Sequence, residues 1–177
     1  MRHIFYRKDL ADTDKPEDGA VNFANQCFEF KVFSPCWSQV TPQGLKISLA
    51  SLLWALLYLS IWRPQGKEFK YYLFYDEKHL IHYSTVLPKY YRFPFMDKSD
   101  IQIGPYWTAE KHRGLGLCPS VIRKIINDYR SQKKYAYILI PEANIASQKS
   151  AVKAGFEIYG YGVRTRGFFG KFLLQTA

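Results

Sequence analysis

The chain of 177 residues is long enough for one compact domain with a buried core, and its 47% hydrophobic content is that of an ordinary globular protein. The 25 Lys and Arg residues exceed the 15 Asp and Glu residues, and the net charge of +10 favours anionic partners such as nucleotides, nucleic acid or membrane headgroups. The three cysteines, Cys27, Cys36 and Cys118, lack paired short spacing, which argues against a disulfide framework or a metal site and predicts a reduced, cytoplasmic compartment.

The N-terminal part predicts two strands and one apolar helix. The runs HIFYRK and CFEFKVF are rich in aromatic and apolar residues, and the stretch from Leu10 to Gln26 between them is loop-like. The segment Ile47 to Trp62 is almost unbroken in its hydrophobicity, yet as a helix it would extend only about 24 Å against a hydrocarbon core of about 30 Å. We therefore expect a buried core helix and no transmembrane span, with peripheral membrane or partner contact as the alternative.

The middle of the chain predicts a hairpin followed by an interrupted strand. The run YYLFYDEKHLIHYSTVL has the form of two strands joined by a bend at 76–78. The next strand, Asp100 to Thr108, contains Gly104 and Pro105, and proline cannot donate a ladder hydrogen bond. We expect this strand to bulge or to part from a neighbour at that point.

The last third alternates helices and strands. Apolar residues at helical spacing predict a helix at about Pro119 to Arg130, and YAYILIP then reads as a buried strand. The run NIASQKSAVKAG predicts a second helix, with Asn144 as its N-cap and Gly155 as its stop. Two final strands, FEIYGYGV and GFFGKFLLQ, are expected to pair antiparallel. This order predicts an α/β fold with a sheet of mixed direction.

The loop EKHRGLGLCPSVI, Glu110 to Ile122, lies between a predicted strand and a predicted helix. Its glycines let the backbone approach a ligand closely, and loop amides and a helix N-terminus together favour an anion. The basic residues at 111–113 add positive charge, so a pyrophosphate is the expected ligand. The alternative is a solvated basic turn before an ordinary helix. The spacing matches neither a Walker loop nor the dinucleotide fingerprint.

Through this loop and the helix that begins at Asn144, the sequence resembles the GNAT superfamily of acetyl-CoA-dependent N-acetyltransferases. The stretch RGLGLC is similar to the family's Arg/Gln-x-x-Gly-x-Gly/Ala loop, with Cys118 standing in place of the final small residue. The stretch NIASQKSAVKAGF is similar to the family's Asn-x-x-Ser/Ala helix that ends in Lys-x-Gly-Phe. The two motifs cover roughly residues 100–177, whereas residues 1–99 match only in their expected element order.

The resemblance implies one GNAT-like domain over residues 1–177, with an acceptor side in 1–99 and an acetyl-CoA-binding core in 100–177. It implies a mixed, mostly antiparallel sheet flanked by helices, in which the family's fourth and fifth strands splay apart to admit the pantetheine arm. Here these strands are 100–108 and 135–141. The residues implied to contact acetyl-CoA are Trp107, Thr108, Arg113, Gly114, Leu115, Gly116, Leu117, Cys118, Asn144 and Ser147.

The family reaction is direct attack of a neutral amine on the thioester carbonyl, which requires an oxyanion donor and a thiolate acid. A backbone amide near Tyr106 or Trp107 is the implied oxyanion donor. Many members use a tyrosine seven positions after the asparagine as the acid, but that position is Ala151 here. The remaining candidates for the acid are Tyr106, Tyr159 and water, with Ser147 as a contributor.

For the base, His82 lies on the predicted strand beside the splay, and its ordinary pKa near 6.5 suits a base at neutral pH. The alternatives are that His82 is a structural histidine of the core, and that the base acts through water. Glu110 and Asp100 are weaker candidates, because carboxylates at loops and strand ends are usually solvated.

The acceptor side is expected to include Val86 to Asp100, a segment crowded with aromatic rings and basic residues. Aromatic faces stack on sugars and bases, and cations bind phosphates, so we expect a small amine acceptor such as a nucleotide-linked amino sugar of surface polysaccharide synthesis. We expect no nucleic-acid partner. The alternatives are a protein or peptide N-terminal acetyltransferase, a CoA-binding protein without catalysis, and a basic interaction module.

Overall fold

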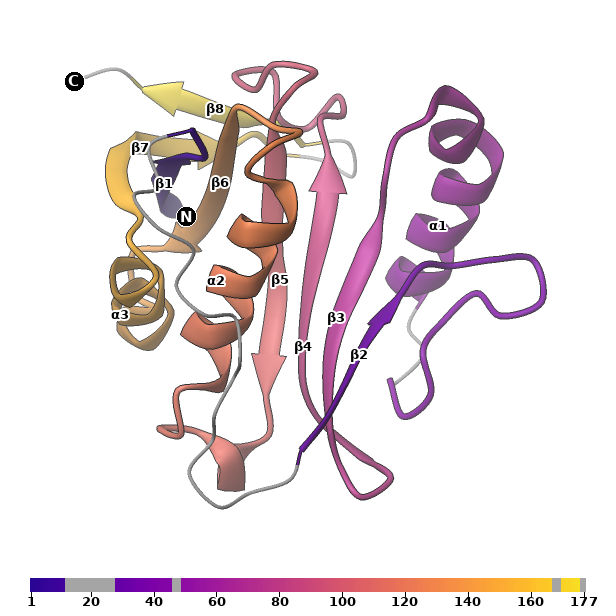
Figure 1. Cartoon of the computed structure of the whole chain (residues 1–177). Coiled ribbons are helices and arrows are strands. Elements are labelled where there is room, and N and C mark those ends of the chain that lie inside the picture. The colour runs from indigo at the N-terminus through magenta and orange to yellow at the C-terminus, as the bar shows by residue number, and fades with distance from the viewer. Residues whose placement is uncertain (12–27, 46–48, 167–169, 176–177) are drawn as a thin grey trace.

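The structure is a computed structural model, and it describes residues 1–11, 28–45, 49–166 and 170–175 (Figure 1). Most of the predicted loop at 10–26, together with Cys27, lies outside the described residues. Eight strands form one sheet in the order β2 (Glu29–Phe33), β3 (Lys70–Asp76), β4 (His79–Pro88), β5 (Ile101–Thr108), β6 (Tyr135–Pro141), β1 (Arg2–Asp9), β7 (Glu157–Arg164) and β8 (Phe172–Gln175). The predicted hairpin is confirmed as β3 and β4, and the predicted C-terminal pair as β7 and β8.

The sheet is mixed and mostly antiparallel, as predicted. Among the described strands, β5 and β6 form the one parallel pair, and they pair only over Ile101 with Ala136 and Gln102 with Tyr137. Beyond Gln102 the two strands separate, while β5 stays paired with β4 as far as Thr108. The parting begins two residues before the cis Gly104–Pro105 bond, so the predicted splay is confirmed.

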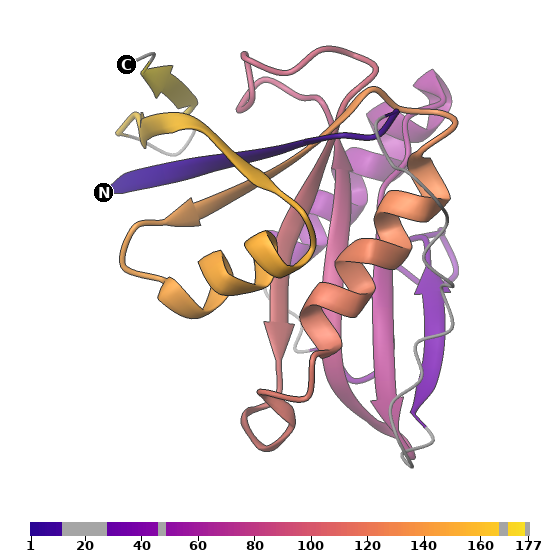
Figure 2. The ribbon, with the colours of Figure 1, turned by 60° about the vertical axis from the view of Figure 1, so that its left-hand side comes forward.

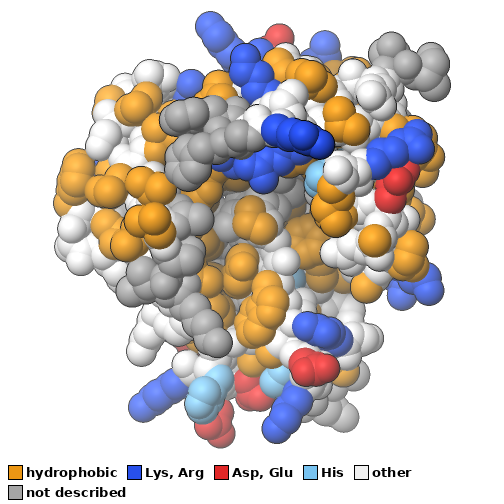
Figure 3. Space-filling view, turned by 180° about the vertical axis from the view of Figure 1, so that it is seen from behind, with side chains coloured by type: hydrophobic (Ala, Val, Ile, Leu, Met, Phe, Trp, Pro, Cys, Tyr) orange, Lys and Arg blue, Asp and Glu red, His pale blue; other side chains and the backbone are white. Residues whose placement is uncertain are grey.

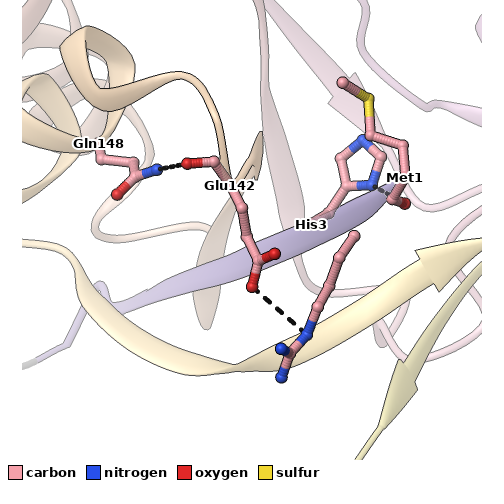
Figure 4. Close-up of polar contacts among 5 residues, drawn as sticks. Met1, His3, Glu142 and Gln148 are labelled. Carbon is pink, nitrogen blue, oxygen red and sulfur yellow. Dashed lines mark hydrogen bonds and ion pairs between the residues drawn. The ribbon is translucent and has the colours of Figure 1, made fainter.

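The first strand is an interior strand of the sheet. β1 pairs antiparallel with β6 on one side and with β7 on the other, although about 125 residues separate it from β6 along the chain. Next to the start of β1, the Arg2 guanidinium forms an ion pair with Glu142 (3.3 Å), and Gln148 donates a hydrogen bond to the Glu142 carbonyl (2.7 Å; Figure 4). These contacts fasten the start of β1 to the segment that leads into α3 (Ile145–Lys153).

Helices cover both faces of the sheet. α2 (Leu117–Tyr129) and α3 lie over one face, and α1 (Leu49–Leu57) lies over the other (Figures 1 and 2). Each face has its own buried cluster. The cluster beneath α2 includes Ile101, Ile103 and Ile125, whereas the cluster beside α1 includes Leu87 and Tyr137. Ile101 and Ile103, which are two positions apart on β5, thus point to the same face of the sheet, as strand geometry requires.

The predicted apolar helix is present but is only partly buried. After α1 the chain continues through a π-helical turn (Tyr58–Trp62) and a short 3-10 turn (Arg63–Gln65). Trp62 is buried in the cluster beside α1, whereas Leu49, Leu53 and Leu56 are exposed. The prediction of a buried core helix is therefore wrong for the outward side of α1, because only the other side of the segment packs on the sheet. None of the described helices is long and apolar enough to cross a membrane.

Candidate functional site

A hollow of about 530 Å³ lies where the end of β5, the loop into α2 and the N-terminal part of α3 meet. It is positioned beside the parting of β5 and β6, because Thr108 ends β5 and Asn144 follows β6. The lining residues are Tyr106, Trp107, Thr108, His112, Arg113, Gly114, Gly116, Leu117, Cys118, Pro119, Asn144, Ala146, Ser147, Lys149, Ser150 and Lys153.

The loop into α2 owes its shape to its glycines. Gly114 and Gly116 have φ values of +82° and +80°, in the left-handed region that favours glycine, and Gly116 is the N-cap of α2. A Cβ atom built on either glycine would meet no atom within 4 Å, so the space in front of both is free. These glycines are required by backbone conformation in the free protein, and they leave room for a ligand at the helix N-terminus.

A second helix N-terminus, that of α3, faces the same hollow. The Asn144 side chain accepts a hydrogen bond from the Ser147 amide (3.1 Å), which confirms the predicted N-cap. The first amides of α2 and α3 have no partners within their own helices, and both helix dipoles place partial positive charge at this end. The hollow is therefore bordered by two helix ends that favour an anion.

Side-chain charge adds to this preference. Arg113, Lys149 and Lys153 line the hollow, and among the described residues that do so none is acidic. The Arg113 side chain also donates from Nε to the Thr108 carbonyl (3.3 Å), which holds the guanidinium beside the end of β5. His112 also lines the hollow, and its Nε2 lies 3.2 Å from a carboxylate oxygen of Asp76. The site suits a ligand with several negative charges.

Two polar side chains that line the hollow, Tyr106 and Cys118, stay protonated at neutral pH. The Tyr106 hydroxyl donates to the Ser147 carbonyl (3.4 Å), and burial raises the pKa of this phenol. Burial also raises the pKa of the Cys118 thiol to about 12. A thiol with such a pKa is a poor nucleophile, whereas a protonated phenol can donate a proton.

His82 lies on β4 opposite Thr108, beside the splay as predicted, but its surroundings differ from expectation. The side chain is fully buried and does not line the hollow. Its Nδ1 lies 2.8 Å from the Thr108 hydroxyl and its Nε2 lies 2.9 Å from the Ser84 hydroxyl, and burial lowers its pKa to about 3. The expectation of an imidazole that titrates near pH 6.5 is therefore wrong. His82 is a neutral side chain that holds the hydroxyl of Thr108, a residue that lines the hollow.

Most residues that the motifs pointed to meet at the hollow. Leu115 does not line it, since its side chain is exposed on the outside of the loop. Lys149 and Ser150 also line the hollow, although the motifs do not predict them. The signal that could have found them is helical spacing, because Ser150 follows Ser147 by three residues and Lys149 follows Ala146 by three. Asp100 is buried and accepts from the Asp97 amide (2.7 Å), which is a structural role.

The aromatic segment 86–100 contributes more to the core than was expected. Tyr90 and Phe93 are buried in the cluster beside α1, and Tyr90 packs edge-on against Trp54 (ring centroids 4.8 Å apart). Tyr91 is exposed, and its hydroxyl accepts a hydrogen bond from Arg92 Nε (3.1 Å). Of the four aromatic rings in this segment, Tyr91 is the exposed one, and the half-buried Arg92 lies beside it.

Comparison of the sequence with family models and with curated proteins gives no match. Comparison with solved structures gives several. A tandem GNAT protein from the clavulanic acid biosynthesis pathway aligns with a TM-score of 0.62 at 14% identity, covering 89% of this chain and 50% of that one. A GCN5-related N-acetyltransferase from Sphaerobacter thermophilus gives 0.56 at 12% identity, covering 90% and 49%.

A GNAT-family acetyltransferase from Colwellia psychrerythraea aligns with a TM-score of 0.54 at 13% identity, covering 90% of this chain and 53% of that one. The present chain thus spans about half the length of these structures. Identities this low carry information on architecture, and the sheet, the splay and the two flanking helices agree with it. The chain has the fold of the GNAT acetyltransferases.

Proposed function

We propose that this protein is an N-acetyltransferase that moves the acetyl group of acetyl-CoA to a primary amine. One observation carries the proposal: two helix N-termini and three basic side chains converge on one hollow, directly beside the gap between β5 and β6. Coenzyme A combines a polyanionic nucleotide with a thin arm that contains amides. The hollow suits the first part by charge, and the unpaired edge of β5 suits the second by hydrogen bonding.

In this proposal the pyrophosphate lies over the loop from Arg113 to Cys118. The Gly116 backbone permits close approach, and the Arg113 guanidinium supplies charge. Lys149 and Lys153, one helical turn apart on α3, balance the remaining negative charge. The arm then runs along β5 from Thr108 toward Gln102, where the strand has no neighbour from β6.

For catalysis, the amine nitrogen attacks the thioester carbonyl carbon, and the carbonyl oxygen takes up negative charge. A backbone amide near Tyr106 or Trp107 on β5 is assigned to that oxygen. When the C–S bond breaks, the Tyr106 phenol, which lines the hollow and is protonated at neutral pH, is assigned to protonate the leaving thiolate. The amine loses its proton to water, while His82 positions the Thr108 hydroxyl through the hydrogen bond between them.

We further propose that the acceptor is a small amine, with a nucleotide-linked amino sugar of cytoplasmic surface-polysaccharide synthesis as the narrower candidate. The molecular face opposite α2 is hollowed at its centre, with hydrophobic walls and with Lys and Arg side chains along one rim (Figure 3). Such a surface suits a ligand that has an apolar or sugar part and a phosphate part.

Two measurements test the proposal. Isothermal titration calorimetry should give binding of acetyl-CoA that weakens with added salt, because the ligand is held largely by charge. A thiol-release assay with acetyl-CoA should then give turnover with at least one member of a panel of amino sugars, nucleotide-linked amino sugars and peptides. Binding without turnover would leave a CoA-binding protein, and turnover with peptides alone would favour a protein acetyltransferase.

A further inference from the structure

Among the described residues, two buried polar side-chain atoms have no hydrogen-bond partner, Gln102 Oε1 and His112 Nδ1, and the first lies at the point where β5 and β6 separate. Gln102 is 6% exposed, and its carboxamide nitrogen donates to the carbonyl of Ile103 (3.0 Å). Its carboxamide oxygen, Oε1, is fully buried and has no hydrogen-bond partner within the structure. Because the Ile103 carbonyl can only accept, the nitrogen must face it, and the orientation of the amide is fixed by chemistry.

An unpaired buried oxygen is unfavourable, since it has given up its hydrogen bonds to water. Native proteins contain few such groups, and those that occur often serve a function. The neighbours of Gln102 across the sheet are Leu87 on β4 and Tyr137 on β6, and both belong to the apolar cluster beside α1. The oxygen therefore lies in an apolar layer, where a hydrogen-bond donor brought in by a ligand would be held strongly.

The position of Gln102 in the sheet determines from which side a hydrogen-bond donor of a ligand can reach Oε1. Ile101 and Ile103 belong to the cluster beneath α2, so Gln102 points to the opposite face, away from the hollow between α2 and α3. It is also the last β5 residue that pairs with β6, at the closed end of the gap. A donor that reaches Oε1 would come from the face of the sheet opposite the hollow, at the closed end of the gap between β5 and β6.

On the basis of the function proposed above, we propose that Gln102 is an amine-binding residue whose Oε1 accepts a hydrogen bond from the N–H of the attacking acceptor amine. A neutral carboxamide oxygen can orient the amine nitrogen without favouring its protonated form. The lone pair of that nitrogen can then stay directed at the thioester carbon. Gly104 contributes by its lack of a side chain, because a Cβ there would lie 3.3 Å from the Gln102 nitrogen.

The test compares Gln102→Met, Gln102→Glu and a matched control, Gln148→Met. Gln148 also donates from its side-chain amide to a backbone carbonyl, but it lies on α3 and does not line the hollow. Using the amine from the panel that gives the fastest thiol release, Gln102→Met should lower kcat/KM for that amine about 10- to 100-fold, on the scale of one lost buried hydrogen bond. The dissociation constant of acetyl-CoA should not change, and Gln148→Met should behave as wild type in both assays.

The pH dependence of activity in Gln102→Glu distinguishes amine binding from a purely structural role of Gln102. Burial raises the pKa of a glutamic acid, and the protonated acid retains both a donor for Ile103 and a carbonyl oxygen for the amine. Its activity relative to wild type should therefore be highest near pH 6 and should fall as the pH rises, whereas the ratio for Gln102→Met should stay constant.

The outcomes separate this inference from the function on which it rests. If wild type turns over an amine and Gln102→Met does so equally well, the inference is wrong and the proposed function stands. If Gln102→Met instead weakens acetyl-CoA binding, the donor belongs to the pantetheine arm, and the assignment to the amine is overturned. If wild type releases no thiol with any amine of the panel, the proposed function fails and takes this inference with it.

Discussion

Replacing Gly116 by alanine separates the two roles of the glycine in the loop into α2. At φ +80° an L-residue is strained by about 1–2 kcal/mol, and a Cβ at this position meets no atom within 4 Å, so the free protein should lose stability by that amount alone. For a domain of this size, the melting temperature should fall by about 2–8 °C. The new methyl group would then occupy the space through which a phosphate approaches the amides.

The loss of one charge-assisted hydrogen bond to the ligand is on the order of 1.5–3 kcal/mol, which weakens acetyl-CoA binding about 10- to 100-fold. Gly66→Ala is the matched control, because Gly66 has φ +67°, also has nothing within 4 Å of its Cβ position, and lies outside the hollow. Both variants should melt at similarly lowered temperatures, and calorimetry should show weaker acetyl-CoA binding only for Gly116→Ala. Equal affinities in the two variants would refute the placement of the phosphate.

Four further predictions concern single side chains of the site. Arg113→Ala should weaken acetyl-CoA binding by roughly five- to tenfold and should reduce the salt dependence of the dissociation constant measured by calorimetry. Asn144→Asp should keep the melting temperature within about 2 °C of wild type, because aspartate caps equally well, yet should weaken acetyl-CoA binding through charge repulsion; unchanged affinity would reduce Asn144 to a cap. Tyr106→Phe should lower kcat for thiol release by about 100-fold with little change in acetyl-CoA affinity, and a kcat equal to wild type would give the acid role to water. Because His82 has a folded-state pKa of about 3 against about 6.5 when unfolded, its contribution to stability is complete above pH 6.5 and is lost as the pH falls toward 3; urea unfolding of His82→Gln between pH 7 and 4 should show a shallower decline than wild type.

Local signals in the sequence predicted the C-terminal half well. The asparagine cap of α3, the left-handed Gly155 after it and the glycine loop before α2 all follow from side-chain chemistry within a few residues. The parting of β5 from β6 also follows from a local signal, because Gly104 and Pro105 interrupt a strand pattern.

Features that depend on distant contacts were not predictable in the same way. The hydrophobicity of the segment 47–62 gave no indication that one side of it would be exposed, since that depends on how much sheet surface α1 can cover. The sequence also marked His82 as a base, whereas its pKa is set by burial against β5. Gln102 belongs to no sequence motif. Its unpaired oxygen depends on the register of β5 against β6, which the sequence does not reveal.

The interior position of β1 constrains the order in which the protein can assemble. Strands β2, β3, β4 and β5 follow one another in space as in sequence, so each can pair with its predecessor as the chain leaves the ribosome. β1 is synthesised before β6 and β7 and must instead wait until both have emerged, since it hydrogen-bonds to each of them. Closing so long a loop is entropically slow, and until then the facing edges of β6 and β7 are open to pairing with other chains. Nascent protein at this stage is where a chaperone would matter most.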